Sequence, residues 1–259
     1  MVECLRIHAS GRPRSRVARL FGASPLSADA RGWYRAALGE IEVARLLKNL
    51  GDTWRVLRAV APADGLETGR AASASQPDAD CVAIGPAGVF MITTKNHSNQ
   101  RVWVGDDALL VNGRRTNHIR DARSGASDAA RLLSTGVGES VDVTPVIAIV
   151  DPGSLTIKSG VDGVIVISAS QLGRILSRRR PVLEASDVDA TVAAAERTGA
   201  WRLDAHVFDD TFRHANRFTR LRTEVEAASR RRIAWLLGAF LMVAGVVTTV
   251  LIATVPLAV

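Results

Sequence analysis

The sequence predicts an α/β fold with some parallel strand pairing, followed by one transmembrane helix near the C-terminus. Three observations support this prediction. Residues 78–96 form two apolar runs around the turn sequence Gly85-Pro86-Ala87-Gly88, which is the pattern of a β-hairpin. Residues 144–197 alternate between apolar strand patterns and helical patterns, which is typical of an α/β layer. The residues from Ile233 to Val259 include no charged side chain.

The N-terminal third alternates between irregular and regular patterns. Residues 1–30 are rich in Arg, Ser, Gly and Pro without a sustained period, which predicts a flexible arm. Residues 31–50 place their apolar side chains broadly on one face and predict a helix that Gly51 ends. Residues 54–60 predict a strand, and the small polar residues 61–77 predict a loop. The hairpin of residues 78–96 follows.

Further elements follow in order. A second hairpin is predicted at residues 101–104 and 108–111, and Asn112-Gly113 is a further turn signal. A helix is predicted at residues 117–134. The apolar run 144–150 has the composition of a strand buried on both faces, and residues 163–168 give a second such strand. Helices are predicted at residues 171–178 and 186–197, and a long polar helix at 209–232.

The charge-free C-terminal run is long enough to cross a bilayer, which takes ~20 apolar residues in a helix. Arg230, Arg231 and Arg232 precede it, and no basic residue follows it. By the positive-inside rule, this asymmetry places the N-terminal part in the cytosol, in a membrane protein with a single pass near its C-terminus. The predicted domains are therefore an arm (1–30), an α/β domain (31–205), a helical stalk (206–232) and a transmembrane helix (233–255).

Composition narrows the function only a little. The net charge of +7 is compatible with binding to nucleic acid or anionic lipid, but scattered surface arginines explain it equally well. The two cysteines, Cys4 and Cys81, lack metal-ligand spacing and make no disulfide framework, which fits a reducing compartment.

Polar residues at the open end of the first hairpin are the candidate site. Asp80 enters the first strand and Lys95 leaves the second, so an antiparallel pairing brings them close together. Glu40 lies on the helix expected to pack on this sheet. Two carboxylates and a lysine at a sheet edge can hold Mg²⁺ or Mn²⁺ and activate water against a phosphodiester. Glu40, Asp80 and Lys95 are thus the catalytic candidates.

The same stretch supplies the candidate metal ligands. Asp80 and the backbone carbonyl of Thr94 are the expected ligands. Asp78 and Thr93 are auxiliary candidates, because Asp78 lies two residues from Asp80 and shares its side of an extended strand. The alternatives without a metal are a strand-entry carboxylate at Asp80 and a solvated lysine at Lys95. His97 fits a solvent-exposed histidine, and His118 has no paired metal spacing.

The region from Gly32 to Asp151 resembles the NERD domain, a nuclease-related member of the PD-(D/E)XK, restriction-endonuclease-like superfamily. The matching residues are Gly39, Glu40, Asp80, Gly85, Pro86, Gly88, Val89, Phe90, Thr94, Lys95 and Asn96. The resemblance implies a central mixed sheet flanked by helices. It also implies a divalent metal held at Asp80 and at an acid two residues before the lysine.

The sequence departs from this family pattern at two places. The position of the second acid is occupied by Thr93, whose neutral hydroxyl is a weak ligand for Mg²⁺. The family's helix after the sheet commonly offers a glutamine, and residues 117–134 contain none. Two functions therefore stay open: a membrane-anchored, metal-dependent nuclease acting on DNA or RNA, and a catalytically inactive module that binds nucleic acid or a protein partner.

Overall fold

The computed structural model describes residues 2–10, 15–59, 79–198, 201–203 and 208–254. The chain divides into two compact units. One comprises residues 1–31 and 212–259, and the other comprises residues 32–211.

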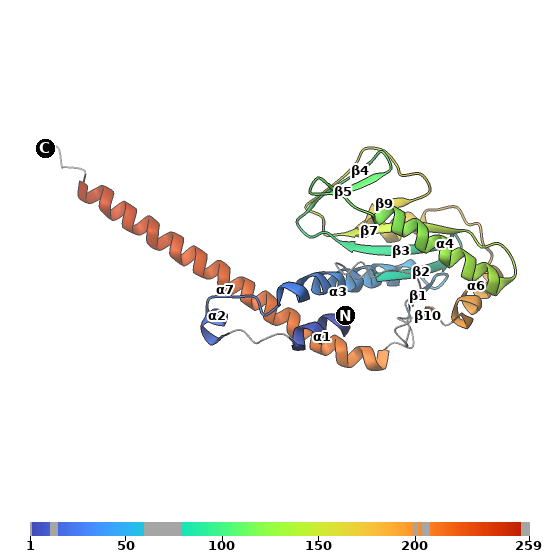
Figure 1. Cartoon of the computed structure of the whole chain (residues 1–259), viewed down its shortest axis with the longest axis horizontal. Coiled ribbons are helices and arrows are strands. Elements are labelled where there is room, and N and C mark those ends of the chain that lie inside the picture. The colour runs from blue at the N-terminus through green and yellow to red at the C-terminus, as the bar shows by residue number, and fades with distance from the viewer. Residues whose placement is uncertain (1, 11–14, 60–78, 199–200, 204–207, 255–259) are drawn as a thin grey trace. The chain divides into compact units, whose positions relative to one another are not determined.

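The larger unit is an α/β domain (Figure 1). Its strands are β1 (Arg55–Ala59), β2 (Ala79–Gly85), β3 (Gly88–Asn96), β4 (Arg101–Gly105), β5 (Ala108–Val111), β6 (Arg114–Arg115), β7 (Val143–Val150), β8 (Ser154–Ile157), β9 (Ile165–Ser168) and β10 (Trp201–Leu203). Its α-helices are α3 (Ala28–Leu47, which begins in the smaller unit), α4 (His118–Val137), α5 (Leu172–Ser177) and α6 (Ala185–Arg197). Short 3₁₀ turns follow α3 (Lys48–Leu50) and precede α5 (Ala169–Gln171).

The central sheet has six strands in the order β10-β1-β2-β3-β7-β9. The pairs from β10 to β3 are antiparallel, and β3-β7 and β7-β9 are parallel. The sheet is therefore mixed, as the sequence predicted. Strand β3 pairs antiparallel with β2 and parallel with β7. The hairpin β2-β3 and the parallel partner β7 are confirmed at their predicted positions. The short strands β6, β8 and β10 were not predicted.

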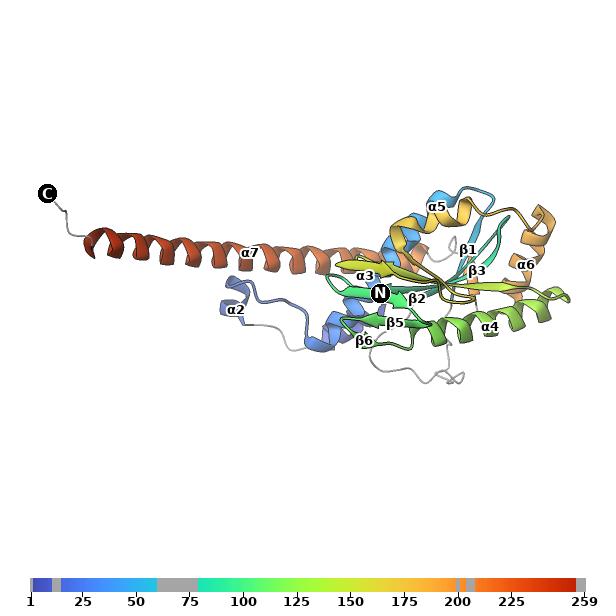
Figure 2. The same cartoon turned by 90° about the horizontal axis from the view of Figure 1, so that it is seen from above.

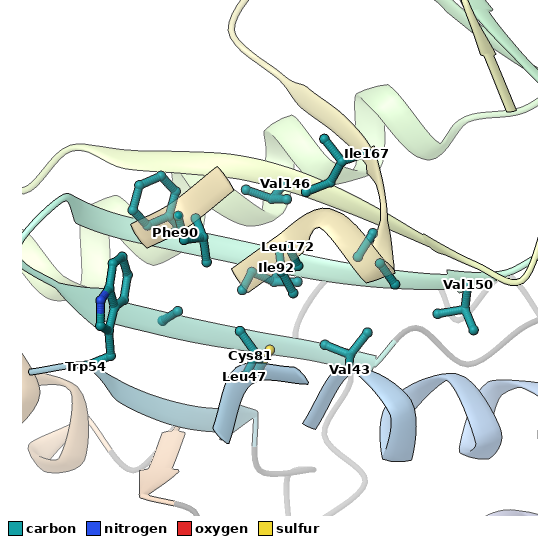
Figure 3. Close-up of a cluster of buried hydrophobic side chains, with 14 residues drawn as sticks. Val43, Leu47, Trp54, Cys81, Phe90, Ile92, Val146, Val150, Ile167 and Leu172 are labelled. Atoms are coloured by element: carbon teal, nitrogen blue, oxygen red, sulfur yellow. The ribbon is translucent and has the colours of Figure 1, made fainter. Parts of the chain in front are cut away.

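Helices cover both faces of the central sheet (Figure 2). On one face, Phe90 and Ile92 of β3 pack with Val43 and Leu47 of α3 and with Leu172 of α5 (Figure 3). On the other face, β2 and β3 pack against α4 and α6 through Val82, Met91, Leu133 and Val192. A strand with apolar side chains on both faces belongs at the centre of such a layered core.

A second sheet of four strands, in the order β6-β5-β4-β8, lies beside the first. Val102, Val104 and Leu109 of this sheet share a buried cluster with Ile119 of α4 and Ile149 of β7. The cluster covers the end of the central sheet near the carboxyl end of β3. It therefore helps to enclose the predicted site from the α4 side.

The smaller unit is helical. It contains α1 (Val2–Ser10), α2 (Arg16–Leu20) and most of α7 (Phe208–Thr254). The sequence predicted an irregular flexible arm for residues 1–30. This was wrong for α1 and α2, because tertiary contacts complete helices that have little periodicity of their own; Cys4 is fully buried.

The predicted stalk and transmembrane segment form one continuous helix, α7. Its stretch Arg217–Val250 is long and apolar enough to cross a membrane, and the rest of the protein does not bury its apolar window. The domain therefore carries a single candidate membrane span near its C-terminus, in the part of the chain that the structure describes.

Candidate functional site

The carboxyl end of β3 carries five consecutive buried polar residues. Thr93, Thr94, Lys95, Asn96 and His97 are between 3% and 9% exposed. Burying polar groups costs free energy unless they find partners, and lysine is almost never fully buried without compensation. A purely structural strand has no need for such a run. The first half of the strand is apolar, so the change at Thr93 marks the beginning of the candidate site.

The register of the hairpin places Asp80 beside this run. Asp80 lies directly opposite Thr93, and Ala79 lies opposite Thr94. Because side chains alternate along a strand, the register positions of Asp80, Thr93 and Lys95 share one face of the sheet. Asp78 and the side chain of Asp80 lie outside the described part of the structure. The backbone thus brings Asp80 and Lys95 to the same end of the hairpin, as the sequence predicted, and the register also gives them the same face.

Glu40 comes from α3, which packs on the opposite face of the sheet. The preceding residue, Gly39, allows the helix to approach β3 closely. A Cβ atom at Gly39 would lie 3.2 Å from Thr94 Cγ2 and 3.4 Å from Asn96 Cβ. Glu40 itself is half-buried. The three catalytic candidates therefore reach the same end of the sheet, with Glu40 on a helix that covers the Thr94 face and Lys95 on the other face.

Asn96 fastens α3 to the end of β3. Its Nδ2 donates to the carbonyl oxygen of Arg35 at 2.8 Å, one turn before Gly39. Its Oδ1 accepts from the backbone N–H of Ser98 at 3.1 Å and from the Ser98 hydroxyl at 2.6 Å. Two of these three hydrogen bonds are made with backbone groups. Asn96 therefore positions the helix that carries Glu40.

Two histidines extend the Lys95 face. His97 continues β3 on the same face, and His118 is the first residue of α4. Their Nε2 atoms are 3.3 Å apart, and their rings stack with centroids 5.3 Å apart. His97 Nδ1 lies 3.0 Å from Gln100 Oε1. Since an amide oxygen only accepts, His97 donates from Nδ1 and accepts at Nε2 from the Nε2–H of His118.

Burial and positive charge keep this histidine pair neutral. Burial is the main cause that lowers the pKa of His97; the hydrogen bond to Gln100 opposes the shift, and the charge of Lys95 adds to it. The pKa of His118 is lowered to about 3, first by burial and then by the charges of Lys95 and His97. Lys95 therefore lies beside two neutral imidazoles whose N–H groups are taken up by Gln100 and by the histidine pair itself, so any attraction for an anion such as a phosphate comes from Lys95.

The described residues do not form a complete metal site by themselves. Among the side chains that the structure describes, no three from His, Cys, Asp and Glu gather as ligands. The residue opposite Asp80 is the neutral Thr93, and Mg²⁺ prefers carboxylate oxygens. A metal at this end of the sheet would depend on the carboxylate of Asp80, with the Thr94 carbonyl as a further donor.

Sequence reasoning did not identify the histidine pair or the role of Asn96. The spacing of Lys95 and His97, two residues apart on one strand, was a usable signal, because it places both on one face. His118 gave no signal, since its approach to His97 depends on how α4 packs on the sheet. The expectation that His97 is solvent-exposed was wrong; it is 4% exposed.

A comparison with protein families finds one match: the model of the nuclease-related domain, NERD, covers residues 35–150. The matched region begins in α3 and ends with β7, so it contains Glu40, Asp80 and Lys95. Comparisons with curated proteins and with solved structures found no significant match.

Proposed function

We propose a function from the premise that residues 35–150 are a nuclease-related domain, of the general PD-(D/E)XK-like kind. The domain hydrolyses phosphodiester bonds of nucleic acid, DNA or RNA, while α7 holds it at a membrane. The observation that carries the proposal is Lys95, which is buried at the end of β3, two residues after Thr93, the residue opposite Asp80. A buried lysine is suited to bind a phosphate through its positive charge.

The roles follow from this placement. Lys95 binds a non-bridging phosphate oxygen and stabilises the negative charge that develops there in the transition state. Asp80 and the Thr94 carbonyl would hold Mg²⁺ or Mn²⁺, with Asp78 and Thr93 as auxiliary donors. A bound divalent ion supplies a more acidic water at neutral pH. Glu40 orients the attacking water from the α3 side, and Asn96 keeps α3 in place for this task.

The membrane tether is part of the proposal. Arg230, Arg231 and Arg232 are exposed and directly precede the apolar part of α7, and no basic residue follows. This charge asymmetry favours a nuclease-related domain on the cytosolic side, anchored by one pass near the C-terminus. The substrate is then nucleic acid that reaches the cytosolic face of the membrane.

The test uses the full-length protein in detergent micelles or nanodiscs. Plasmid, linear, single-stranded DNA and RNA substrates are incubated with Mg²⁺ or Mn²⁺, and cleavage products are followed on gels. Lys95→Ala should reduce the rate at least ~10²-fold, the usual effect of removing a transition-state donor. Lys158→Ala, which removes an exposed lysine of the same unit, is the matched control and should leave the rate unchanged. Equal activity of wild type and Lys95→Ala would refute hydrolysis at this site.

One observation favours the alternative, a catalytically inactive module that binds nucleic acid or a protein partner. Thr93 stands opposite Asp80 where a second acid would be needed, which weakens metal binding. Titration calorimetry with Mn²⁺ separates the two functions. Binding that disappears in Asp80→Ala supports the enzyme. Absence of Mn²⁺ binding, together with affinity for nucleic acid that falls steeply as salt is raised, supports the binding module.

A further inference from the structure

Helix α2 keeps its apolar side chains exposed. Val17, Leu20 and Phe21 are 65%, 58% and 53% exposed, although the sequence around them is polar. They are spaced at i, i+3 and i+4, so they lie on one face of the helix. The exposed Arg16 and Arg19 lie away from the centre of this apolar face. Ser15 caps the helix by accepting from the N–H of Ala18 at 3.2 Å. The segment is thus a formed amphipathic turn whose apolar side chains stay more than half exposed among the described residues.

Specific contacts fix the position of α2 along α7. Trp235 Nε1 donates to the Leu20 carbonyl at 3.0 Å, and the Phe21 and Trp235 ring centroids are 4.9 Å apart. Arg231 Nη1 donates to the Arg19 carbonyl at 3.2 Å. The two helices therefore meet between Arg231 and Trp235, and Figure 1 shows α2 alongside α7 at this level.

Gly22 makes the close approach possible. It has φ of +76°, and a Cβ atom there would lie 2.4 Å from the backbone nitrogen of Arg232 and 2.6 Å from the Ala228 carbonyl oxygen. No other residue could fit both this backbone conformation and this distance. The backbone of the N-terminal segment therefore packs closely on α7 at a defined position along that helix.

This position on α7 coincides with the boundary between its charged part and its charge-free part. Arg232 is the last charged residue of α7, and Trp235, 49% exposed, lies in its next turn. In a membrane-spanning helix this boundary lies at the headgroup region, where Trp and Arg are favoured. The exposed apolar face of α2 continues the exposed apolar surface that begins at Ile233, and its arginines match anionic headgroups.

We propose that α2 is a second membrane contact: Val17, Leu20 and Phe21 insert into the bilayer boundary beside Trp235, with Arg16 and Arg19 at the lipid headgroups. This rests on the proposed membrane tether by α7. The surface takes lipid rather than a protein partner, because its apolar face is continuous with that of the candidate span. The N-terminal segment then fixes which residues of α7 lie at the membrane surface.

The test measures depth at single positions of the full-length protein in vesicles of phosphatidylcholine and phosphatidylglycerol. Leu20→Cys, Val182→Cys and Leu241→Cys are each labelled with an environment-sensitive fluorophore. Cys4 and Cys81 are buried, so the unsubstituted chain gives the labelling background. Val182 is the matched control, since it is 69% exposed and lies in the larger unit. Quenching by lipids spin-labelled near the headgroup is compared with quenching by aqueous iodide.

The proposal expects the label at Leu20→Cys to be quenched several-fold more by the lipids than by iodide, and the label at Val182→Cys to behave in the opposite way. Quenching by iodide at both of these positions, with lipid quenching at Leu241→Cys, would overturn the α2 contact and leave the tether standing. A label at Leu241→Cys without lipid quenching would overturn the tether as well. A label at Leu20→Cys shielded from both quenchers would show that protein covers α2, and would also overturn the proposal.

Discussion

The two halves of β3 are equally buried and chemically opposite. Val89 to Ile92 are apolar and between 0% and 4% exposed, whereas Thr93 to His97 are polar and between 3% and 9% exposed. Burial of the first half lowers the free energy of the fold directly through the hydrophobic effect. Burial of the second half costs free energy that its hydrogen bonds only offset. The difference teaches that burial alone does not identify an apolar core, and it makes the polar half the candidate site.

The largest expected effect belongs to the apolar half. Phe90→Ala should lower the free energy of unfolding by ~3–5 kcal/mol, because it leaves a cavity between α3, α5 and the sheet. Thr94→Val is the matched change in the polar half and should cost less, about 0.5–1.5 kcal/mol, because it leaves no large cavity and removes only the hydroxyl. Denaturant unfolding of the full chain in detergent measures both. Equal losses of unfolding free energy in the two variants would contradict the division of β3 into an apolar half that stabilises the fold and a polar half that does not.

The second largest effect is expected on the affinity of the polar half of β3 for a divalent ion. Thr93→Asp restores an acid opposite Asp80 and beside Lys95, and should tighten Mn²⁺ binding at least ~10-fold, about 1.4 kcal/mol. Titration calorimetry measures the dissociation constant. Thr93→Asn is a neutral control of similar size and should change the affinity little. A Thr93→Asp protein that binds Mn²⁺ no better than Thr93→Asn would argue against a metal at this position.

A smaller effect is expected where α3 meets the polar half. Gly39→Ala should destabilise the fold by ~1 kcal/mol, because the contact at 3.2 Å to Thr94 Cγ2 outweighs the better helix propensity of alanine. Gly173→Ala is the control in a helix, since its Cβ would meet only the Leu46 carbonyl at 3.8 Å; it should stabilise by up to ~1 kcal/mol.

The contact with Thr94 can be checked independently of helix propensity. Thr94→Ser removes Cγ2 and should restore most of the stability that Gly39→Ala loses. Thermal unfolding of the single and double variants gives the coupling energy. Strict additivity of the two changes would show that α3 does not press on β3 at this point.

The smallest effect is a pH dependence of stability. Folding lowers the pKa of His118 from the ordinary value of 6.5 to about 3, and it also lowers the pKa of His97. Between these pH values the unfolded chain binds protons that the folded chain does not, so stability rises with pH and levels off above about 6.5. Each of the two histidines contributes at most ~1.4 kcal/mol per pH unit to this slope.

Thermal unfolding midpoints measured between pH 5 and 8 test this dependence. Most carboxylates have titrated below this range, so the histidines dominate it. His118→Gln should flatten the profile between pH 5 and 6.5, since one of the two titrating groups is gone. A profile that is unchanged in His118→Gln would assign the pH dependence to other groups.

The sequence predicted the elements that have strong local signals. The β2-β3 hairpin followed from the Gly85-Pro86 turn between apolar runs, and β7 followed from its continuous apolar core. Strands β8 and β10 were missed because they are short, and β8 is mostly exposed and shows no alternation. Helices α1 and α2 were missed because they are short and have little periodicity of their own, and α2 also makes contacts with α7 that the local sequence does not show.

The candidate site was also predicted only where a local signal existed. Asp80 and Lys95 were placed at one end of the hairpin from the turn alone, because an antiparallel register follows from the turn. The pairing of His97 with His118 could not be predicted, since it depends on the angle at which α4 crosses the sheet. The burial of Lys95 was missed for the same reason: the second sheet and α4 cover it, and both lie later in the chain.

The position of β3 between β2 and β7 has a consequence for the order of folding. The pairing with β2 needs only a tight turn, whereas the parallel pairing with β7 joins residues that lie 54 positions apart, as in Val89 and Val143. Local hairpins close within microseconds, and distant parallel pairings form later. We therefore expect Lys95 and its polar neighbours to stay hydrated in the hairpin and to lose water only when β7 docks. The site would then form after the hairpin, when β7 docks, and would take up water again when β7 separates.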